Sequence, residues 1–371
     1  MKALQDLETP ALLLDRAKLE ANWRRMSARI AALGPALRLH VKTAKSLEVV
    51  RRLHGAARGP ICVSTLKEAE IFGAAGYRDI LYTVALAPNK LARAAALVQG
   101  GMRLSVIVDN VELAQAIAGA PLDVLIEIDS DGHRAGLKPD DSRLVQVAKV
   151  LARGGATVAG VMTHAGASYN CASTGEIRAM AAQERDAVVH AARRLRDAGI
   201  AAPVVSVGST PTATFADDLA GVTEVRAGVF VFFDLVMAGI DVCAAGDIAL
   251  SVLATVIGHQ ADKGWALTDA GWMAMSRDRG TAKQKVDQGY GLVCDVAGNP
   301  IEGLIVADAN QEHGIVAHRS GDPRRLPELP VGTLLRILPN HACATGAQHE
   351  RYQVLGAAGR VEAAWERFSG W

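Results

Sequence analysis

The sequence predicts a (β/α)8 barrel followed by an all-β domain, and three observations lead to this fold class. Eight short β-branched runs occur between residues 37 and 232, and helix-compatible stretches separate each consecutive pair. Beyond about Asp234 this alternation stops, and short β-like runs follow one another between turn residues. The chain has 371 residues, half of them hydrophobic, which suits a barrel of ~250 residues with a smaller second domain.

The elements follow in order from the N-terminus. A β-like segment, TPALLLD (9–15), opens the chain. The eight runs are LRLHVK (37–42), ICVS (61–64), DILYTV (79–84), RLSVIVD (103–109), DVLIEID (123–129), TVAGVMTH (157–164), PVVSVGS (203–209) and EVRAGVFVF (224–232). Longer amphipathic segments such as EIRAMAAQERDAVVHAARRLRDAG lie between them, as in β-α-β units. Eight parallel strands with intervening helices close most naturally into a barrel.

The second part of the chain has a different rhythm. Its runs are LSVLATVIGH, GWALTDAG, GLVCDVAG, GLIVADA and GTLLRILPNHA, separated by turn residues. We therefore expect a barrel domain over residues 1–235 and a β domain over residues 236–371. The first β segment, about residues 9–15, is a candidate member of the second domain.

Charge and composition exclude several classes of protein. The 40 Lys and Arg residues balance 39 Asp and Glu residues, so no broad positive field is available for nucleic acid or an acidic membrane. Five cysteines without a C-x-x-C pair argue against a disulfide framework. No signal peptide pattern and no run of ~18 uncharged residues is present. We expect a cytoplasmic protein that binds neither nucleic acid nor membrane.

Candidate reactive groups lie at the C-terminal ends of the runs, where barrel enzymes place their active sites. Lys42 ends the first run, where a lysine can lose enough solvation to form a Schiff base and later act as a base. A solvated or ion-paired lysine is the alternative, and Lys45 is the rival amine. Gly208, Ser209 and Thr210 follow the seventh run, where backbone N–H groups favour a phosphate; a turn without a ligand is the alternative.

Other residues belong to the same predicted barrel mouth. Arg134, in DGHRAG, can donate to a phenolate or carboxylate, or it can pair with a neighbouring aspartate. Further polar candidates, for each of which a structural role is at least as good an explanation as a catalytic one, are His164, Tyr169, Arg226 and His313.

An H-x-C pair lies near the C-terminus. His341 and Cys343 occur inside PNHACAT, where alternate residues of an extended chain point the same way and can present imidazole and thiolate to one ion. Two ligands leave an open coordination sphere, which suits a catalytic metal that binds substrate oxygen. A buried cysteine near a hydrogen-bonded histidine is the alternative.

Eight motifs taken together resemble one family along nearly the whole chain. They are TPALLLD, LRLHVKTAKS, VSTLKEAE, EIDSDGHRAG, THAG, VGSTPT, EVRAGVFVFFD and PNHACATGA. They resemble the D-serine dehydratase and D-threonine aldolase family, built on the alanine-racemase type of pyridoxal-phosphate fold (fold type III). The resemblance implies a barrel that carries pyridoxal 5'-phosphate, a β domain that carries a divalent metal (zinc, manganese, cobalt or magnesium), and a homodimer.

The resemblance also implies residue roles and an activity. Lys42 would carry the cofactor, Arg134 would approach its phenolic oxygen, and His341 and Cys343 would hold the metal. His164, Tyr169, Gly208, Ser209, Thr210, Arg226 and Gly228 would complete the cofactor site. The implied reaction is dehydration of a small D-3-hydroxy amino acid, with D-threo-3-hydroxyaspartate the expected substrate and D-serine or D-threonine further ones. A D-threonine-type aldolase, a metal-independent racemase and a non-catalytic pyridoxal-phosphate carrier are the alternatives.

One motif departs from the family pattern. Many relatives read K-T-H-K where this chain has Lys42, Thr43, Ala44 and Lys45. Ala44 cannot supply the imidazole, which weakens the aldolase and eukaryote-like D-serine dehydratase alternatives.

Overall fold

The computed structural model describes residues 2–356 and 359–371, and the chain divides into two compact units. The barrel unit comprises Arg25–Gly228 together with Gly370–Trp371, and the β unit comprises Met1–Arg24 together with Val229–Ser369. The first boundary between the units falls within the first long helix, and the second lies between Gly228 and Val229.

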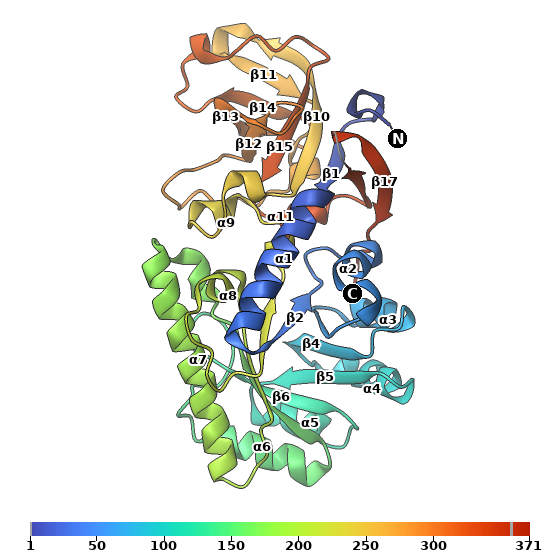
Figure 1. Ribbon diagram of the computed structural model, residues 1–371, viewed down its shortest axis with the longest axis vertical. Helices are drawn as coiled ribbons and strands as arrows, with labels where there is room; N and C mark the ends of the chain where they lie inside the picture. The colour runs from blue at the N-terminus through green and yellow to red at the C-terminus, as the bar shows by residue number, and fades with distance from the viewer. Residues whose placement is uncertain (1, 357–358) are drawn as a thin grey trace. The chain divides into compact units, whose positions relative to one another are not determined.

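Eight parallel strands form a closed barrel in the barrel unit (Figure 1). The ring closes where β9 pairs with β2, for example Glu224 opposite Ala36. The strands are β2 (Ala36–His40), β3 (Ile61–Val63), β4 (Asp79–Ala85), β5 (Arg103–Val108), β6 (Asp123–Ile128), β7 (Thr157–Thr163), β8 (Val204–Val207) and β9 (Glu224–Ala227). Each lies within or overlaps one of the eight predicted runs, so the predicted barrel is confirmed.

The eighth run is a strand only over its first four residues. After Ala227 the chain turns, and Val229–Val231 form a short 3-10 helix. Phe230 and Phe232 are fully buried there. The apolar pattern of EVRAGVFVF therefore reflects burial rather than a continuing strand.

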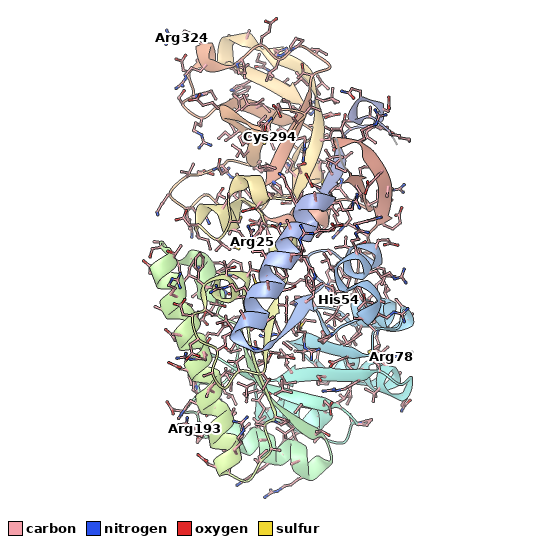
Figure 2. All side chains as sticks on the ribbon, in the orientation of Figure 1. Arg25, His54, Arg78, Arg193, Cys294 and Arg324 are labelled. Atoms are coloured by element: carbon pink, nitrogen blue, oxygen red, sulfur yellow. The ribbon has the colours of Figure 1, made fainter. Side chains whose placement is uncertain are left out.

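Helices alternate with the barrel strands, and Figure 1 shows α4 to α7 outside them. The helices are α1 (Arg16–Leu33), α2 (Leu47–His54), α3 (Leu66–Ala74), α4 (Leu91–Gln99), α5 (Val111–Ile117), α6 (Arg143–Gly154), α7 (Thr174–Asp197) and α8 (Thr210–Phe215). A buried cluster that includes Cys62, Leu81 and Ile107 fills the barrel interior, whereas Arg78 and Arg193 are exposed (Figure 2). Strands covered on both faces explain their near-continuous apolar sequence.

The β unit is built on one nine-stranded sheet, which confirms the predicted all-β part. Its order is β11-β14-β13-β12-β15-β10-β1-β16-β17, and an additional β10–β11 pairing closes six of these strands into a ring. The strands are β1 (Ala11–Asp15), β10 (Leu250–Gln260), β11 (Trp265–Thr268), β12 (Gly291–Cys294), β13 (Pro300–Ala309), β14 (Gly314–His318), β15 (Leu334–Pro339), β16 (Arg351–Leu355) and β17 (Val361–Glu366). The opening segment thus pairs with β10 and β16 of this sheet.

Three short helices complete the β unit: α9 (Leu235–Gly239), α10 (Trp272–Met275) and α11 (Ala342–Gly346). Across the described ranges 2–356 and 359–371, no helix is both long enough and apolar enough to cross a bilayer.

Candidate active site

Two lysines follow β2, and their surroundings differ. Lys42 lies in the turn directly after the strand and is exposed. Lys45 has a left-handed backbone (φ 43°), and its Nζ lies 3.0 Å from Oε1 of Glu68, whose side chain is fully buried. A lysine held by a buried carboxylate is a structural tie, because breaking such a pair leaves an uncompensated charge. Lys42 is therefore the amine of this turn that is available for chemistry.

His40, the last residue of β2, adjoins Lys42. Its Nε2 lies 3.0 Å from the Thr83 hydroxyl, which donates its own hydrogen to the Val63 carbonyl at 3.0 Å. We therefore assign the imidazole proton to Nε2, so that Nδ1 accepts the backbone N–H of Lys42 at 3.4 Å. Burial, followed by the positive charges of Lys42 and Arg226, lowers the pKa of His40 well below its usual range. The imidazole is neutral at physiological pH.

His164 follows β7 and is also neutral. Its Nδ1 donates to the Gly208 carbonyl at 2.7 Å, which leaves Nε2 as the unprotonated nitrogen. Burial is the largest cause that lowers the pKa of His164 to about 3, and the charges of Lys42, Arg226 and Arg134 act in the same direction. The Tyr169 ring lies 6.2 Å from the His164 ring, tilted by 48°.

The loop after β8 begins with a glycine that no other residue can replace without rearrangement. Gly208 has φ +146°, and a Cβ on it would lie 1.9 Å from the carbonyl oxygen of Arg226. Ser209 caps α8 by accepting the Thr212 N–H at 3.2 Å, and its hydroxyl lies 2.9 Å from that of Ser168. Several hydroxyl groups therefore gather at this loop.

Two further candidate residues border the same loop. Thr210 begins α8 and is buried. Gly228 follows β9, and a Cβ there would lie 2.8 Å from the His40 carbonyl oxygen. The loop after β8 thus approaches the backbone of β9 closely, and the turn after β9 approaches the end of β2.

Two arginines add positive charge at these strand ends. The buried Arg226 guanidinium donates to the Ser206 hydroxyl and to the Thr163 carbonyl. Arg134 is exposed in the loop after β6, where its charge lowers the pKa values of Glu127 and His164. Burial is the larger effect on Glu127 and raises its pKa overall. Arg226 and Arg134 thus bring two guanidinium groups to these strand ends, where they can attract an anionic ligand.

The H-x-C pair lies in the β unit, and its local geometry differs from the expected extended chain. His341 is extended at the N-cap of α11, whereas Cys343 lies in the first turn of that helix. Oδ2 of Asp278 lies 2.6 Å from Nδ1 of His341, and the imidazole also forms a hydrogen bond with the Cys343 side chain. Burial lowers the pKa of His341, but Asp278, Cys343 and Asp234 outweigh burial and raise it.

Buried residues brace the His341 segment. Asp234 accepts the Ala342 N–H at 3.0 Å, and Asn340 donates to the carbonyls of Asp278 at 3.2 Å and Gly289 at 2.7 Å. The sequence reasoning missed these residues. Asn340 and Asp234 stand inside recognisable motifs, PNHACATGA and EVRAGVFVFFD, but Asp278 is 63 residues from His341 and carries no local signal.

His313 is exposed in the turn between β13 and β14.

The donor set at His341 fits a divalent metal with open positions. Within the described part of the chain, no group of three or more His, Cys, Asp or Glu side chains is arranged to hold an ion. A metal-ligating histidine usually donates its other ring N–H to a carboxylate, as His341 does to Asp278. Imidazole and thiolate suit zinc and similar ions.

Comparison with known proteins gives a consistent result. Residues 14–236 match the family model of the alanine racemase N-terminal domain, and residues 249–355 match that of a serine dehydratase domain. The chain is 55% identical to D-threo-3-hydroxyaspartate dehydratase of Delftia sp. (strain HT23), with 99% of each chain covered. It is 33% identical to a D-threonine aldolase of Arthrobacter sp., covering 98% of this chain and 93% of the aldolase.

Solved structures agree with these similarities. The Delftia dehydratase superposes with a TM-score of 0.96 at 54% identity over the full length of both chains. A variant of that enzyme, with the same TM-score, is in a metal-free form. The chain therefore belongs to the D-serine dehydratase and D-threonine aldolase family, on the alanine-racemase type of fold.

Proposed function

We propose that this chain is a pyridoxal-phosphate- and divalent-metal-dependent dehydratase that converts D-threo-3-hydroxyaspartate to oxaloacetate and ammonia. The observation that carries the proposal is the end-to-end similarity to the Delftia dehydratase, which is 55% identical and covers 99% of this chain. D-serine and D-threonine are candidate further substrates.

The barrel unit fits the cofactor. Lys42 offers the amine, since Lys45 is held by Glu68. The phosphate would lie against the Gly208–Thr210 loop, where Ser209 and Thr210 offer hydroxyl groups, and Gly228 and Tyr169 would complete the surroundings. Arg226 and Arg134 supply positive charge for the ring and phosphate of an anionic cofactor. His164 and His40, both neutral, add polar groups without further charge.

When bound, pyridoxal phosphate supplies an aldehyde that takes up an amine and a ring that stabilises negative charge at the substrate Cα. Lys42 Nζ would hold the cofactor at rest and then remove the proton from Cα of the substrate. Nδ1 of the neutral His40 accepts the backbone N–H of Lys42. This hydrogen bond limits the positions that the Lys42 Nζ can reach. Because the His40 imidazole is neutral, it places no second positive charge beside the Lys42 amine.

A divalent metal, when bound, supplies a Lewis acid that makes a hydroxyl a better leaving group. His341 would hold it through Nε2 and Cys343 through Sγ, while Asp278 orients the imidazole. Loss of the Cα proton and the β-hydroxyl removes one water molecule from the substrate. The released enamine tautomerises to an imine, and water hydrolyses the imine to oxaloacetate and ammonia.

Product analysis tests the proposal. We expect purified, cofactor-supplemented protein to release ammonia and oxaloacetate in equal amounts from D-threo-3-hydroxyaspartate. Chelation with EDTA should abolish this release, and a divalent ion should restore it. Protein that stays colourless with pyridoxal phosphate and releases no ammonia would contradict the proposal.

The alternatives predict different products. An aldolase would break the Cα–Cβ bond and give glycine. This alternative is worth testing because a D-threonine aldolase is among the relatives of this chain. A racemase that needs no metal would remain active after chelation and give the L-substrate. A non-catalytic carrier would bind the cofactor without turnover.

Three further expectations belong to the proposal. We propose a homodimer, which light scattering after size-exclusion chromatography would detect, and a cytoplasmic location. We also propose that the functional division follows residues 1–235 for the cofactor and 236–371 for the metal, with residues 9–15 contributing to the second part through the pairing of β1 with β10.

A further inference from the structure

Glu184 is a buried carboxylate that the proposed reaction does not use. It lies in the middle of α7 and is 2% exposed. Its Oε1 accepts the backbone N–H of Ala165 at 2.9 Å and that of Gly208 at 3.1 Å. A carboxylate rarely occupies such a position unless hydrogen bonds compensate for its burial.

The two amide groups belong to different loops. Ala165 directly follows His164 after β7, and Gly208 opens the loop after β8. A third bond closes the arrangement, because the Gly208 carbonyl accepts Nδ1–H of His164 at 2.7 Å. One carboxylate oxygen and one imidazole therefore fix the His164 loop and the Gly208 loop to each other.

We propose that Glu184 is a positioning residue that sets the Gly208–Thr210 loop and His164 in register for the cofactor's phosphate. This inference rests on the proposed function, since it takes pyridoxal phosphate as the ligand of the barrel unit. Removing the carboxylate would leave two buried N–H groups without this acceptor, and the loops would shift to find water or other partners.

The role follows from geometry rather than from charge. A carboxylate behind an anion-binding loop repels a phosphate, so its charge cannot be what favours binding. Burial raises the pKa of Glu184, while hydrogen bonds from Thr212, Ala165 and Gly208 act in the opposite direction. Glu184→Gln keeps the oxygen that accepts both N–H groups and removes the charge. Glu184→Asp keeps the charge but is one methylene too short to reach both loops.

Comparison of pyridoxal phosphate with pyridoxal isolates the phosphate loop. The dissociation constants of both compounds are measured by titrating the full-length, cofactor-stripped protein and its variants. We expect Glu184→Ala and Glu184→Asp to bind pyridoxal phosphate about tenfold or more weakly, with little change for pyridoxal, because buried N–H groups left without an acceptor disturb the loop. Glu184→Gln should bind pyridoxal phosphate as tightly as the parent or more tightly.

Glu176→Ala is the matched control, since Glu176 lies on the same helix and accepts a backbone N–H of Ala172 at 2.8 Å, but at an exposed position. It should leave both constants unchanged. An unaltered preference for pyridoxal phosphate in Glu184→Asp and Glu184→Ala would overturn the inference, as would a Glu184→Gln variant as weak as Glu184→Asp. A parent protein that binds no pyridoxal phosphate would instead refute the proposed function itself.

Discussion

Replacing Asp278 tests whether His341 is a metal ligand held by a carboxylate. In the parent, Oδ2 of Asp278 lies 2.6 Å from Nδ1 of His341, at the short end of the distances expected for a charge-assisted hydrogen bond. Asp278→Ala removes the bond. Asp278→Asn retains an amide oxygen as acceptor but loses the charge, so it separates orientation of the ring from electrostatic assistance.

The size of the effect follows from the role of such carboxylates. Loss of an outer partner of a ligating histidine typically costs about 10- to 100-fold in metal affinity, or about 1.4–2.8 kcal/mol. A neutral hydrogen bond is roughly half as strong as a charge-assisted one, so Asp278→Asn should recover about half of that free energy. We expect the alanine variant to be the weaker metal binder of the two.

The pH dependence has a definite sign. The Asp278 bond contributes to the raised pKa of His341, and the protonated imidazole competes with a metal for Nε2. At neutral pH, proton competition therefore lowers the metal affinity of the parent more than that of the variants. The advantage of the parent over Asp278→Ala should grow as pH rises, because the competing proton is lost.

Metal content after dialysis against graded chelator concentrations measures this affinity directly. Asp287→Asn is the matched control, because Asp287 lies in the same loop but is exposed and accepts a hydrogen bond from Arg279 at 2.8 Å. Equal metal retention by the parent and Asp278→Ala from neutral to alkaline pH would show that His341 does not hold the ion in the proposed way.

Three other changes give separable outcomes. Lys42→Ala should abolish covalent incorporation of the cofactor on borohydride reduction, whereas Lys45→Ala should retain it; a labelled peptide containing Lys45 in place of Lys42 would reverse the assignment. Gly208→Ala should destabilise the protein by about 3 kcal/mol or more in urea unfolding, since its Cβ would lie 1.9 Å from a backbone oxygen. Gly155→Ala is the control, because Gly155 has φ +96° with nothing within 4 Å and should show only the backbone strain. The pKa of His164 is lowered from 6.5 to about 3, so the unfolded chain takes up the proton first and stability falls as pH drops through that interval. His164→Gln should flatten this part of the pH profile of the free energy of unfolding, and an unchanged slope would contradict it.

The fold could be predicted because each of its signals is local. Eight apolar runs mark eight strands, and β-branched residues between turns mark the β unit. The rule that barrels place chemistry at strand ends then selected Lys42, His164 and the Gly208 loop. The end of β9 was misplaced because burial of Phe230 and Phe232 imitates a continuing strand.

Residues that would position other residues, here Glu184 and Asp278, have no local sequence pattern that marks them. Glu184 lies 19 and 24 positions from the amides it binds, and Asp278 lies 63 positions from His341. Each stands in a segment whose local pattern, a helix for Glu184 and a turn for Asp278, is complete without it. Their roles depend on long-range pairing, which a single sequence does not encode in its spacing.

The two lysines of the first motif show how a distant partner decides a local ambiguity. The strand-end rule favours Lys42, but Lys45 is only three residues further along and remains a rival amine on sequence grounds. Glu68, 23 residues further on in VSTLKEAE, makes the difference, because its buried carboxylate bonds the Ser64 N–H at 2.6 Å and pairs with Lys45. If Lys45 left Glu68, that carboxylate would stay buried without a compensating charge. The same ion pair therefore stabilises the β3–α3 turn and keeps Lys45 from acting as the reactive amine.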